Sequence, residues 1–314
     1  MPRARSIVTQ AGHVGSLQDS LFAVLKERTN ASDTAQQRTP SASTSATRPI
    51  SFITLASSSA GNCSVLRHGT TDNHRLTLID CGLSPRKTRA LLAALGTDID
   101  RIDDVILTHL DHDHCHKGWA KSLPSHARFR LYHKHLARAR RNGIAWRKTE
   151  PFDAPFTTPS LGRVTPIIMA HDELGVAAFR FDLPIGHALG YATDLGRSSP
   201  TLERTLAGVH TLAVESNYCP ILQQQSTRPD FLKLRITGGA GHLSNDQSAE
   251  LVRAVRPTST VVLLHLSREC NSPQHAFDAH AHPACTVIAA GADAPSTDWL
   301  SLAPAATASA SPTA

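Results

Sequence analysis

The stretch Thr108-His109-Leu110-Asp111-His112-Asp113-His114-Cys115-His116 holds the densest group of chemically active side chains in the sequence. It directly follows the apolar run DVILT (104–108), which predicts a strand. A strand end is rigid and the loop beyond it is open, so side chains there are held in place and remain accessible. Four imidazoles and two carboxylates lie within residues 109–116. Imidazole and carboxylate together suit Zn, Mn or Fe, so this segment predicts a metal-binding loop rather than a His-rich polar loop.

The same pattern recurs at other strand ends. Each of four further apolar runs is followed at once by a carboxylate or an imidazole. These residues are Asp80 in LTLIDCG, His171 in PIIMAHDE, Asp194 in LGYATDLG and His265 in VVLLHLS. A single residue of this kind is a turn aspartate or a core histidine about as often as it is a metal ligand. Five such sites in one chain favour a shared metal centre.

Composition bounds the class of protein. The chain has 314 residues, a formal net charge of +6, 18 histidines and six cysteines. It has no apolar run of the ~18 residues that a membrane span needs, and its start resembles no secretory signal. Sparse cysteines without a CxxC pair favour reduced thiols in a cytoplasmic protein. We therefore expect a cytoplasmic protein with no membrane segment.

The sequence predicts one folded domain between two tails. We expect residues 1–49 to be a disordered extension with one short helix over Leu17–Leu25, because residues 29–48 are rich in Ser, Thr, Ala and Gln. The folded domain is expected over residues 50–290, and a flexible tail over residues 291–314.

Within the domain, short β-type runs alternate with helical patterns. Strands are predicted over residues 75–80, 104–108, 164–169, 177–183, 189–193, 211–215 and 260–264. Ser84-Pro85 predicts the start of a helix that ends at Gly96, and Asn245 is the expected cap of a helix over 245–255. Many strands with a few helices indicate a layered α/β fold.

The order of these polar residues resembles the metallo-β-lactamase fold superfamily of metal-dependent hydrolases. Flanking blocks narrow the resemblance to its WalJ/YycJ-like branch. They are SSSAGNCSVL (57–66), ATD (192–194), VESN (214–217), LKLRITGGAGHLSN (232–245) and LLHLS (263–267). The resemblance covers roughly residues 51–280 and implies a four-layer αββα sandwich.

One departure from the superfamily pattern concerns the metal loop. The superfamily signature is His-x-His-x-Asp-His, whereas this chain has Asp111 where the second His belongs. His112 or His116 remain alternatives for the missing imidazole, although spacing favours Asp111. An added carboxylate makes the site harder, which shifts the expected preference from Zn toward Mn or Fe.

The resemblance implies two divalent metal ions. One would be held by His109, Asp111, His171 and Asp194, and the other by Asp113, His114, Asp194 and His265. Asp194 would then bridge the metals, and Asp80 would orient the ligand loop from outside. Asp113 and His242 are the expected catalytic residues, with His242 as a general acid or phosphate clamp rather than a structural histidine.

A basic run directly follows the metal loop and indicates the substrate. Residues 114–149 contain ten Lys and Arg and no Asp or Glu. Such a run attracts a polyanion, although a solvated helix face would have the same composition. The expected substrate-binding residues are Arg138, Arg140, Arg141, Asn217, Lys233 and Arg235. Trp119, Tyr132 and Trp146 are the nearby aromatic residues that could stack on bases.

These features together predict an enzyme that hydrolyses phosphodiester bonds, with exonuclease-type action on DNA favoured by the resemblance. A small-molecule hydrolase acting on a cyclic phosphodiester, thioester or lactone is the first alternative. A nucleic-acid-binding protein that loads metal poorly is the second. The sequence gives no oligomeric state.

Overall fold

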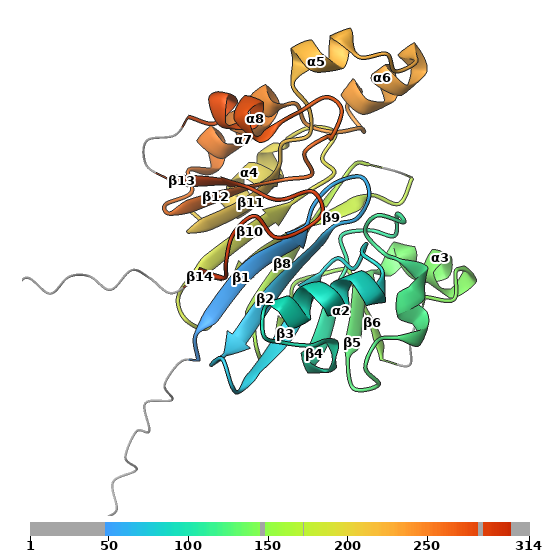
Figure 1. Cartoon of the computed structure of the whole chain (residues 1–314), viewed down its shortest axis with the longest axis vertical. Helices are drawn as coiled ribbons and strands as arrows, with labels where there is room; N and C mark the ends of the chain where they lie inside the picture. The colour runs from blue at the N-terminus through green and yellow to red at the C-terminus, as the bar shows by residue number, and fades with distance from the viewer. Residues whose placement is uncertain (1–47, 145–147, 172, 282–284, 303–314) are drawn as a thin grey trace, which may run out of the picture. The chain divides into compact units, whose positions relative to one another are not determined.

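The computed structural model describes residues 48–144, 148–171, 173–281 and 285–302. Two mixed β-sheets pack face to face, and helices cover their outer faces (Figure 1). This arrangement confirms the αββα sandwich expected from the sequence. The short helix expected over Leu17–Leu25 and the linker over residues 29–47 lie outside the described residues.

Both sheets follow one plan, in which neighbouring strands are mostly consecutive in the chain. The first sheet has the order β14 (Leu300–Ser301), β1 (Ile50–Ala56), β2 (Cys63–Gly69), β3 (His74–Ile79), β4 (Ile102–Ile106), β5 (Arg128–Tyr132) and β6 (Thr149–Phe152). The second has the order β13 (Thr286–Ala289), β12 (Thr260–Leu264), β11 (Thr211–Glu215), β10 (Ala188–Ala192), β9 (Val176–Asp182), β8 (Gly162–Met169) and β7 (Phe156–Thr158). Strands β3–β6 pair parallel in the first sheet and β10–β13 in the second, while the earlier strands of each sheet pair antiparallel.

The helices begin at recognisable caps. They are α2 (Pro85–Ala94), α3 (Leu136–Arg141), α4 (Pro200–Leu206), α5 (Pro220–Gln225), α6 (Asp230–Thr237), α7 (Asn245–Val255) and α8 (Pro273–Ala279), with short 3₁₀ turns η1 (Ile99–Arg101), η2 (Lys117–Lys121) and η3 (His133–His135). Ser84 caps α2 as predicted. The cap of α7 is Ser244, whose side chain accepts a hydrogen bond from the Gln247 amide, so the expectation for Asn245 was wrong. The Asn245 side-chain oxygen Oδ1 instead accepts a hydrogen bond from the buried Ser216 hydroxyl.

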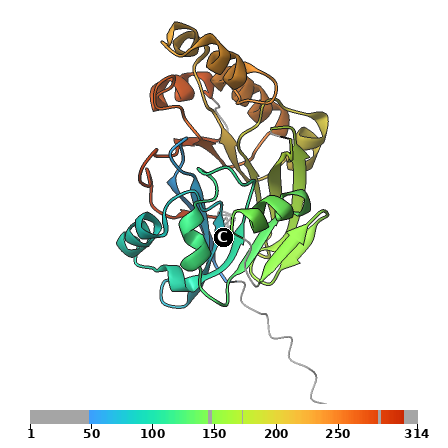
Figure 2. The ribbon, with the colours of Figure 1, turned by 90° about the vertical axis from the view of Figure 1, so that its right-hand side faces the viewer.

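Three apolar layers stabilise the sandwich. The layer between the sheets contains large rings such as Phe52, Phe179 and Phe181. The outer face of the first sheet packs against α2, η2 and α3, and that of the second against α4, α7 and α8. Figure 2, turned by 90°, shows these helices outside the paired sheets. Each buried large side chain contributes about 1.5–3 kcal/mol through removal from water, so the sandwich positions its loops rigidly.

The folded part extends beyond the boundary expected at residue 290. β14 pairs with β1 through Ser51 and Ser301, and Leu302 is fully buried between the sheets. All six cysteines lie in the described residues and are free. Among the described helices, none combines the length and apolar character needed to cross a bilayer. The cytoplasmic location stays a prediction.

The parallel strands of both sheets direct their carboxyl ends toward one region. Asp80 follows β3, Asp194 follows β10, Glu215 ends β11 and His265 follows β12. In open sheets, the carboxyl ends of parallel strands are where ligands bind, because the loops there diverge and leave a crevice. The topology therefore brings together side chains that are far apart in the sequence.

Candidate metal centre

Three strand-end residues of this region share an unusual backbone conformation. Asp80, Asp194 and His265 have φ values of 62°, 55° and 56°. Positive φ costs a residue with a Cβ atom about 1–3 kcal/mol, and such conformations concentrate at functional sites. The remaining described non-glycine residue of this kind, Arg256, ends α7. The fold thus maintains a strained backbone at three positions of one cluster.

Backbone contacts clamp the loop that carries the histidines. The Asn62 amide donates to the Asp113 carbonyl at 2.7 Å, and the Cys81 amide donates to the His114 carbonyl at 2.8 Å. Gly82 is required here, because a Cβ atom on it would overlap the Asp113 carbonyl. The Gly-Asn-Cys and Asp-Cys-Gly blocks therefore fix the position of the metal loop.

Asp80 orients the His114 ring through a contact with its Nδ1 atom. Its carboxylate is fully buried, accepts hydrogen bonds from the Thr108 amide and hydroxyl, and lies 2.7 Å from His114 Nδ1. Burial raises the pKa of Asp80. With Nδ1 engaged, His114 turns Nε2 toward Asp194, at 2.9 Å from Oδ2. A carboxylate behind a histidine is the usual arrangement for fixing the tautomer of a metal ligand.

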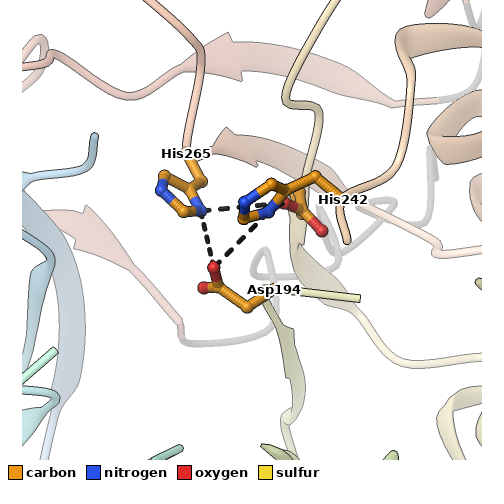
Figure 3. Close-up of side chains that lie close together, drawn as sticks. Asp194, His242 and His265 are labelled. Carbon is orange, nitrogen blue, oxygen red and sulfur yellow. Dashed lines mark hydrogen bonds and ion pairs between the residues drawn. The ribbon is translucent and has the colours of Figure 1, made fainter. Parts of the chain in front are cut away.

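Asp194 lies at the centre of the cluster. Its Oδ1 is 3.1 Å from His265 Nδ1 and 3.5 Å from His242 Nδ1, while the Thr193 hydroxyl donates to Oδ2 at 2.9 Å. Figure 3 shows Asp194, His242 and His265 turned toward one another. Burial opposes the charge on Asp194, but the His265 and His114 imidazoles hold the pKa of this carboxyl well below its usual range. The buried Asp194 carboxylate therefore contacts His114 from the first sheet's loops and His265 from the second sheet's loops.

The donor atoms form overlapping groups of metal-binding dimensions. Within each group the candidate ligand atoms lie within 4.8 Å of one another. The groups are His109, His171 and Asp194; Asp113, His114 and His265; and Asp194, Glu215, His242 and His265. The first two groups contain the expected ligands of the two metals except Asp111, with Asp194 placed in the first.

Unpartnered nitrogens in the cluster fit a metal. Among the described residues, His171 Nδ1 and His265 Nε2 are buried without a hydrogen-bond partner. Leaving such a group unpaired costs about 1–3 kcal/mol, which coordination of a cation would offset. Imidazole with carboxylate is also the donor set that Zn, Mn and Fe accept. The cluster is therefore suited to a divalent metal.

Asp111 lies at the edge of the cluster. Its Oδ2 is 3.8 Å from His109 Nε2, and its Oδ1 accepts a hydrogen bond from Arg138 Nη2 at 2.8 Å. The two alternatives for the missing imidazole are less suited. The His112 side chain is 89% exposed, and His116 Nδ1 accepts a hydrogen bond from the Gly118 amide. His112 Nδ1 lies 3.8 Å from Asp113 Oδ1, so what favours Asp111 over His112 is that its side chain is 31% exposed rather than 89%.

Glu215 belongs to the site and was missed at the level of sequence. It is fully buried at the end of β11, with Oε1 2.6 Å from His242 Nδ1 and Oε2 accepting a hydrogen bond from the Leu195 amide at 2.7 Å. Burial would lower the pKa of His242, but Glu215 and Asp194 outweigh it and raise this pKa to about 9. The signal was a carboxylate at the end of the apolar run TLAVE, the same pattern that identified Asp80.

A cleft of about 480 Å³ opens above the cluster. Side chains of the cluster line one part of it, and Leu232, Arg235 and Ile236 of α6 line another. Asn217 also lines the cleft, but its side-chain nitrogen Nδ2 donates to the His265 backbone carbonyl at 2.8 Å and so supports that strained residue. The cleft is the space in which a substrate would meet the cluster.

The structure separates the expected substrate-binding residues. Arg235 lines the cleft, whereas Lys233 lies outside it, with Nζ donating to the Gln224 carbonyl at 2.9 Å. Arg138 bonds Asp111, while Arg140 and Arg141 are exposed on α3 and do not line the cleft.

Part of the positive charge in the basic run, residues 114–149, is neutralised by carboxylates of neighbouring strands. Arg128 and Arg130 of β5 lie beside Asp104 and Glu150 of the neighbouring strands, with Arg130 2.8 Å from Asp104 and 2.6 Å from Glu150. Trp119 is fully buried in the core and cannot stack on a base. Trp146 and Arg147 lie outside the described residues.

The fold and site define a metallo-hydrolase class, and comparisons assign the family. The family model of the beta-lactamase superfamily domain matches residues 75–266, so the chain belongs to this superfamily. The chain is also similar to two curated relatives named exodeoxyribonucleases. WalJ of Streptococcus pneumoniae is 26% identical over 239 residues, covering 70% of this chain and 82% of the relative. YycJ of Bacillus anthracis is 27% identical over 238 residues, covering 71% and 84%.

Solved structures confirm the architecture. The metallo-beta-lactamase fold protein YhfI of Bacillus subtilis matches with a TM-score of 0.58 at 14% identity, covering 79% of this chain and 98% of that one. The resemblance to the metallo-β-lactamase superfamily and its WalJ/YycJ-like branch is thereby confirmed.

Proposed function

We propose that the protein is a metal-dependent phosphodiesterase that cleaves DNA as an exonuclease. The proposal rests on the cluster centred on Asp194, in which histidines and carboxylates lie at one wall of a cleft (Figure 3). The names of the relatives, exodeoxyribonucleases, support DNA as the substrate. The test is digestion of end-labelled single- and double-stranded DNA and RNA with added Mn²⁺, Zn²⁺ or Fe²⁺. Stepwise shortening of DNA supports the proposal, and intact DNA under every metal contradicts it.

The cluster would hold two divalent cations. His109, Asp111 and His171 would bind one, Asp113, His114 and His265 the other, and Asp194 would bridge them. Bound there, the metals would lower the pKa of a shared water and neutralise the charge of the phosphate. Hydrolysis breaks the bond between phosphorus and the leaving ester oxygen, so that oxygen needs a proton.

His242 is suited to supply that proton. Glu215 engages Nδ1 at 2.6 Å, so Nε2 is the ring nitrogen left for the leaving oxygen. The carboxylates of Glu215 and Asp194 raise the pKa of this imidazole, which favours its protonated form. Asp113, 14% exposed beside His114 and His265, is the carboxylate we assign to accept the proton of the attacking water. The two groups would then act as acid and base on opposite ends of the reacting bond.

Asp111→His is expected to shift metal preference toward Zn. The change replaces a hard carboxylate by imidazole at a position 3.8 Å from His109 and restores the superfamily pattern. Metal content after equilibration in equimolar Zn²⁺ and Mn²⁺, with activity under each metal, measures the shift. The control is Asp111→Asn, which keeps an oxygen donor but removes the charge. An unchanged Zn/Mn ratio in Asp111→His would mean that position 111 does not coordinate.

The exposed cations of α3 are proposed to attract the DNA backbone. Arg140→Glu/Arg141→Glu is expected to weaken DNA binding severalfold and to reduce its salt dependence by about one phosphate contact per reversed charge. Hydrolysis of bis-p-nitrophenyl phosphate should change little, because neither arginine lines the cleft. Fluorescence anisotropy over a salt series measures the effect. Equal losses on DNA and on the small ester would count against a binding role for α3.

A further inference from the structure

The segment from α5 to α6, residues 220–237, carries most of the exposed large hydrophobic side chains among the described residues. Among the described residues, the large hydrophobic side chains that are exposed are Ile168 at 40%, Ile221 at 63%, Phe231 at 73% and Leu234 at 71%. Three of the four lie in this segment, and α6 buries none of its residues. Figures 1 and 2 both show α5 and α6 at one end of the domain, beyond the sheets. We call this segment the arm.

The two exposed large hydrophobic residues of α6, Phe231 and Leu234, differ in their relation to the cleft. Leu232, Arg235 and Ile236 line the cleft. With about 100° per residue, Phe231 lies only about 40° from Arg235 around the helix axis, one turn away on adjoining surface. Leu234 lies about 160° from both Leu232 and Ile236, on the far side of the helix. Phe231 therefore lies next to Arg235 at the edge of the helix face that lines the cleft, which we call the rim, and Leu234, about 60° further around the helix, faces away from the cleft.

The rim combines this aromatic ring with positive charge. Arg235 faces the cleft, and none of the described carboxylates forms an ion pair with it. Arg228 also lines the cleft and ties the arm to the loop after β12, with Nε 2.8 Å from Glu269 and Nη2 3.2 Å from the Ser267 hydroxyl. An aromatic ring beside an unneutralised guanidinium is the combination with which proteins hold single strands, the ring for a base and the cation for a phosphate.

We propose that Phe231 stacks on a base of a single-stranded polynucleotide whose phosphate contacts Arg235 on its way to the metal cluster. The inference rests on the proposed nuclease function. It makes the arm the surface that receives the end of a strand, because a base inside a duplex has no free face to offer. The Arg235 guanidinium beside Phe231, which forms no ion pair with a described carboxylate, favours this occupant over an apolar protein surface.

A second copy of the chain is the competing occupant, and Leu234 separates the two. An apolar contact between copies would use Phe231 and Leu234 alike, since both are exposed to the same degree. Stacking of a base beside Arg235 uses Phe231 and leaves Leu234 in solvent. Leu234→Ala is therefore a matched control for Phe231→Ala on the same helix.

The experiment measures binding of a fluorescein-labelled single-stranded oligothymidylate to the full-length protein by anisotropy. Phe231→Ala should raise Kd on the order of tenfold, since stacking contributes about 1–3 kcal/mol per base. Leu234→Ala should stay within about twofold, and Phe231→Trp should retain binding. Sedimentation velocity at the same concentrations reports whether either variant changes the association state.

Two outcomes would overturn the inference. One is a Kd for Phe231→Ala that matches wild type. The other is an equal loss in both alanine variants together with dissociation of a dimer, which would assign the arm to contact between copies. Wild-type cleavage of DNA and bis-p-nitrophenyl phosphate is measured alongside. If both substrates stay intact while Phe231→Ala still weakens binding, the nuclease proposal fails and the stacking site stands.

Discussion

Asp194→Ala is expected to abolish hydrolysis and to empty the metal cluster. Asp194 contacts His114 at 2.9 Å and His265 at 3.1 Å, and it belongs to two of the three groups of ligand atoms. Losing a residue that only supports a ligand costs about 10–100-fold in metal affinity or activity, so losing the shared carboxylate should cost more. Mass spectrometric metal analysis and turnover of bis-p-nitrophenyl phosphate measure both effects.

Folding must be separated from metal binding in this variant. Asp194→Asn keeps the shape of the side chain and should fold, yet it should bind metal poorly because the amide is neutral. Asp182→Ala on β9, whose carboxylate pairs with Arg180 at 41% exposure, should keep metal and activity. Near-normal turnover in a folded Asp194→Ala protein would refute a bridging role for this residue.

His242→Ala is expected to keep its metal and lose most of its rate. General acid catalysis contributes about 10²–10⁴-fold, so kcat on DNA should fall in this range. Glu215→Gln should give a smaller loss, because the histidine remains but its Nδ1 partner becomes neutral. Metal content and single-turnover rates are measured on the same preparations.

The alternative role of His242 gives a different pattern. His242 and Glu215 also lie within ligand distance of Asp194 and His265. If His242→Ala loses metal in proportion to activity, the imidazole is a ligand and another group protonates the leaving oxygen.

Local patterns were sufficient to predict the central strands and α7. β11 and β12 were predicted with their observed bounds, because runs such as TLAVE and TVVLL are buried along their whole length. β14 could not be predicted, since two residues have no periodicity and are ordered by pairing with β1. The cap of α7 shifted from Asn245 to Ser244 because tertiary contacts with Ser216 engage the asparagine.

One sequence rule identified most of the residues of the cluster. A polar residue directly after an apolar strand identified Asp80, His171, Asp194 and His265. Glu215 ends the apolar run TLAVE in the same way as Asp80 ends its run, so the rule applies to it as well, although it was not among the expected site residues.

The register of β5 determines how much of the positive charge in the basic run is neutralised. β5 lies between β4 and β6, so that Asp104 pairs with Arg128, and Arg130 with Glu150. These carboxylates come from outside the run, and no inspection of residues 114–149 alone reveals them. The position of Phe231 beside the cleft likewise depends on how α6 packs.

Crystals equilibrated with Mn²⁺ or Zn²⁺ and measured at the absorption edge of each metal test the central claim most directly. The account predicts two anomalous peaks flanking the Asp194 carboxylate, one beside His109 and His171 and the other beside His114 and His265. Anomalous maps without a peak within coordination distance of Asp194, under either metal, would contradict it.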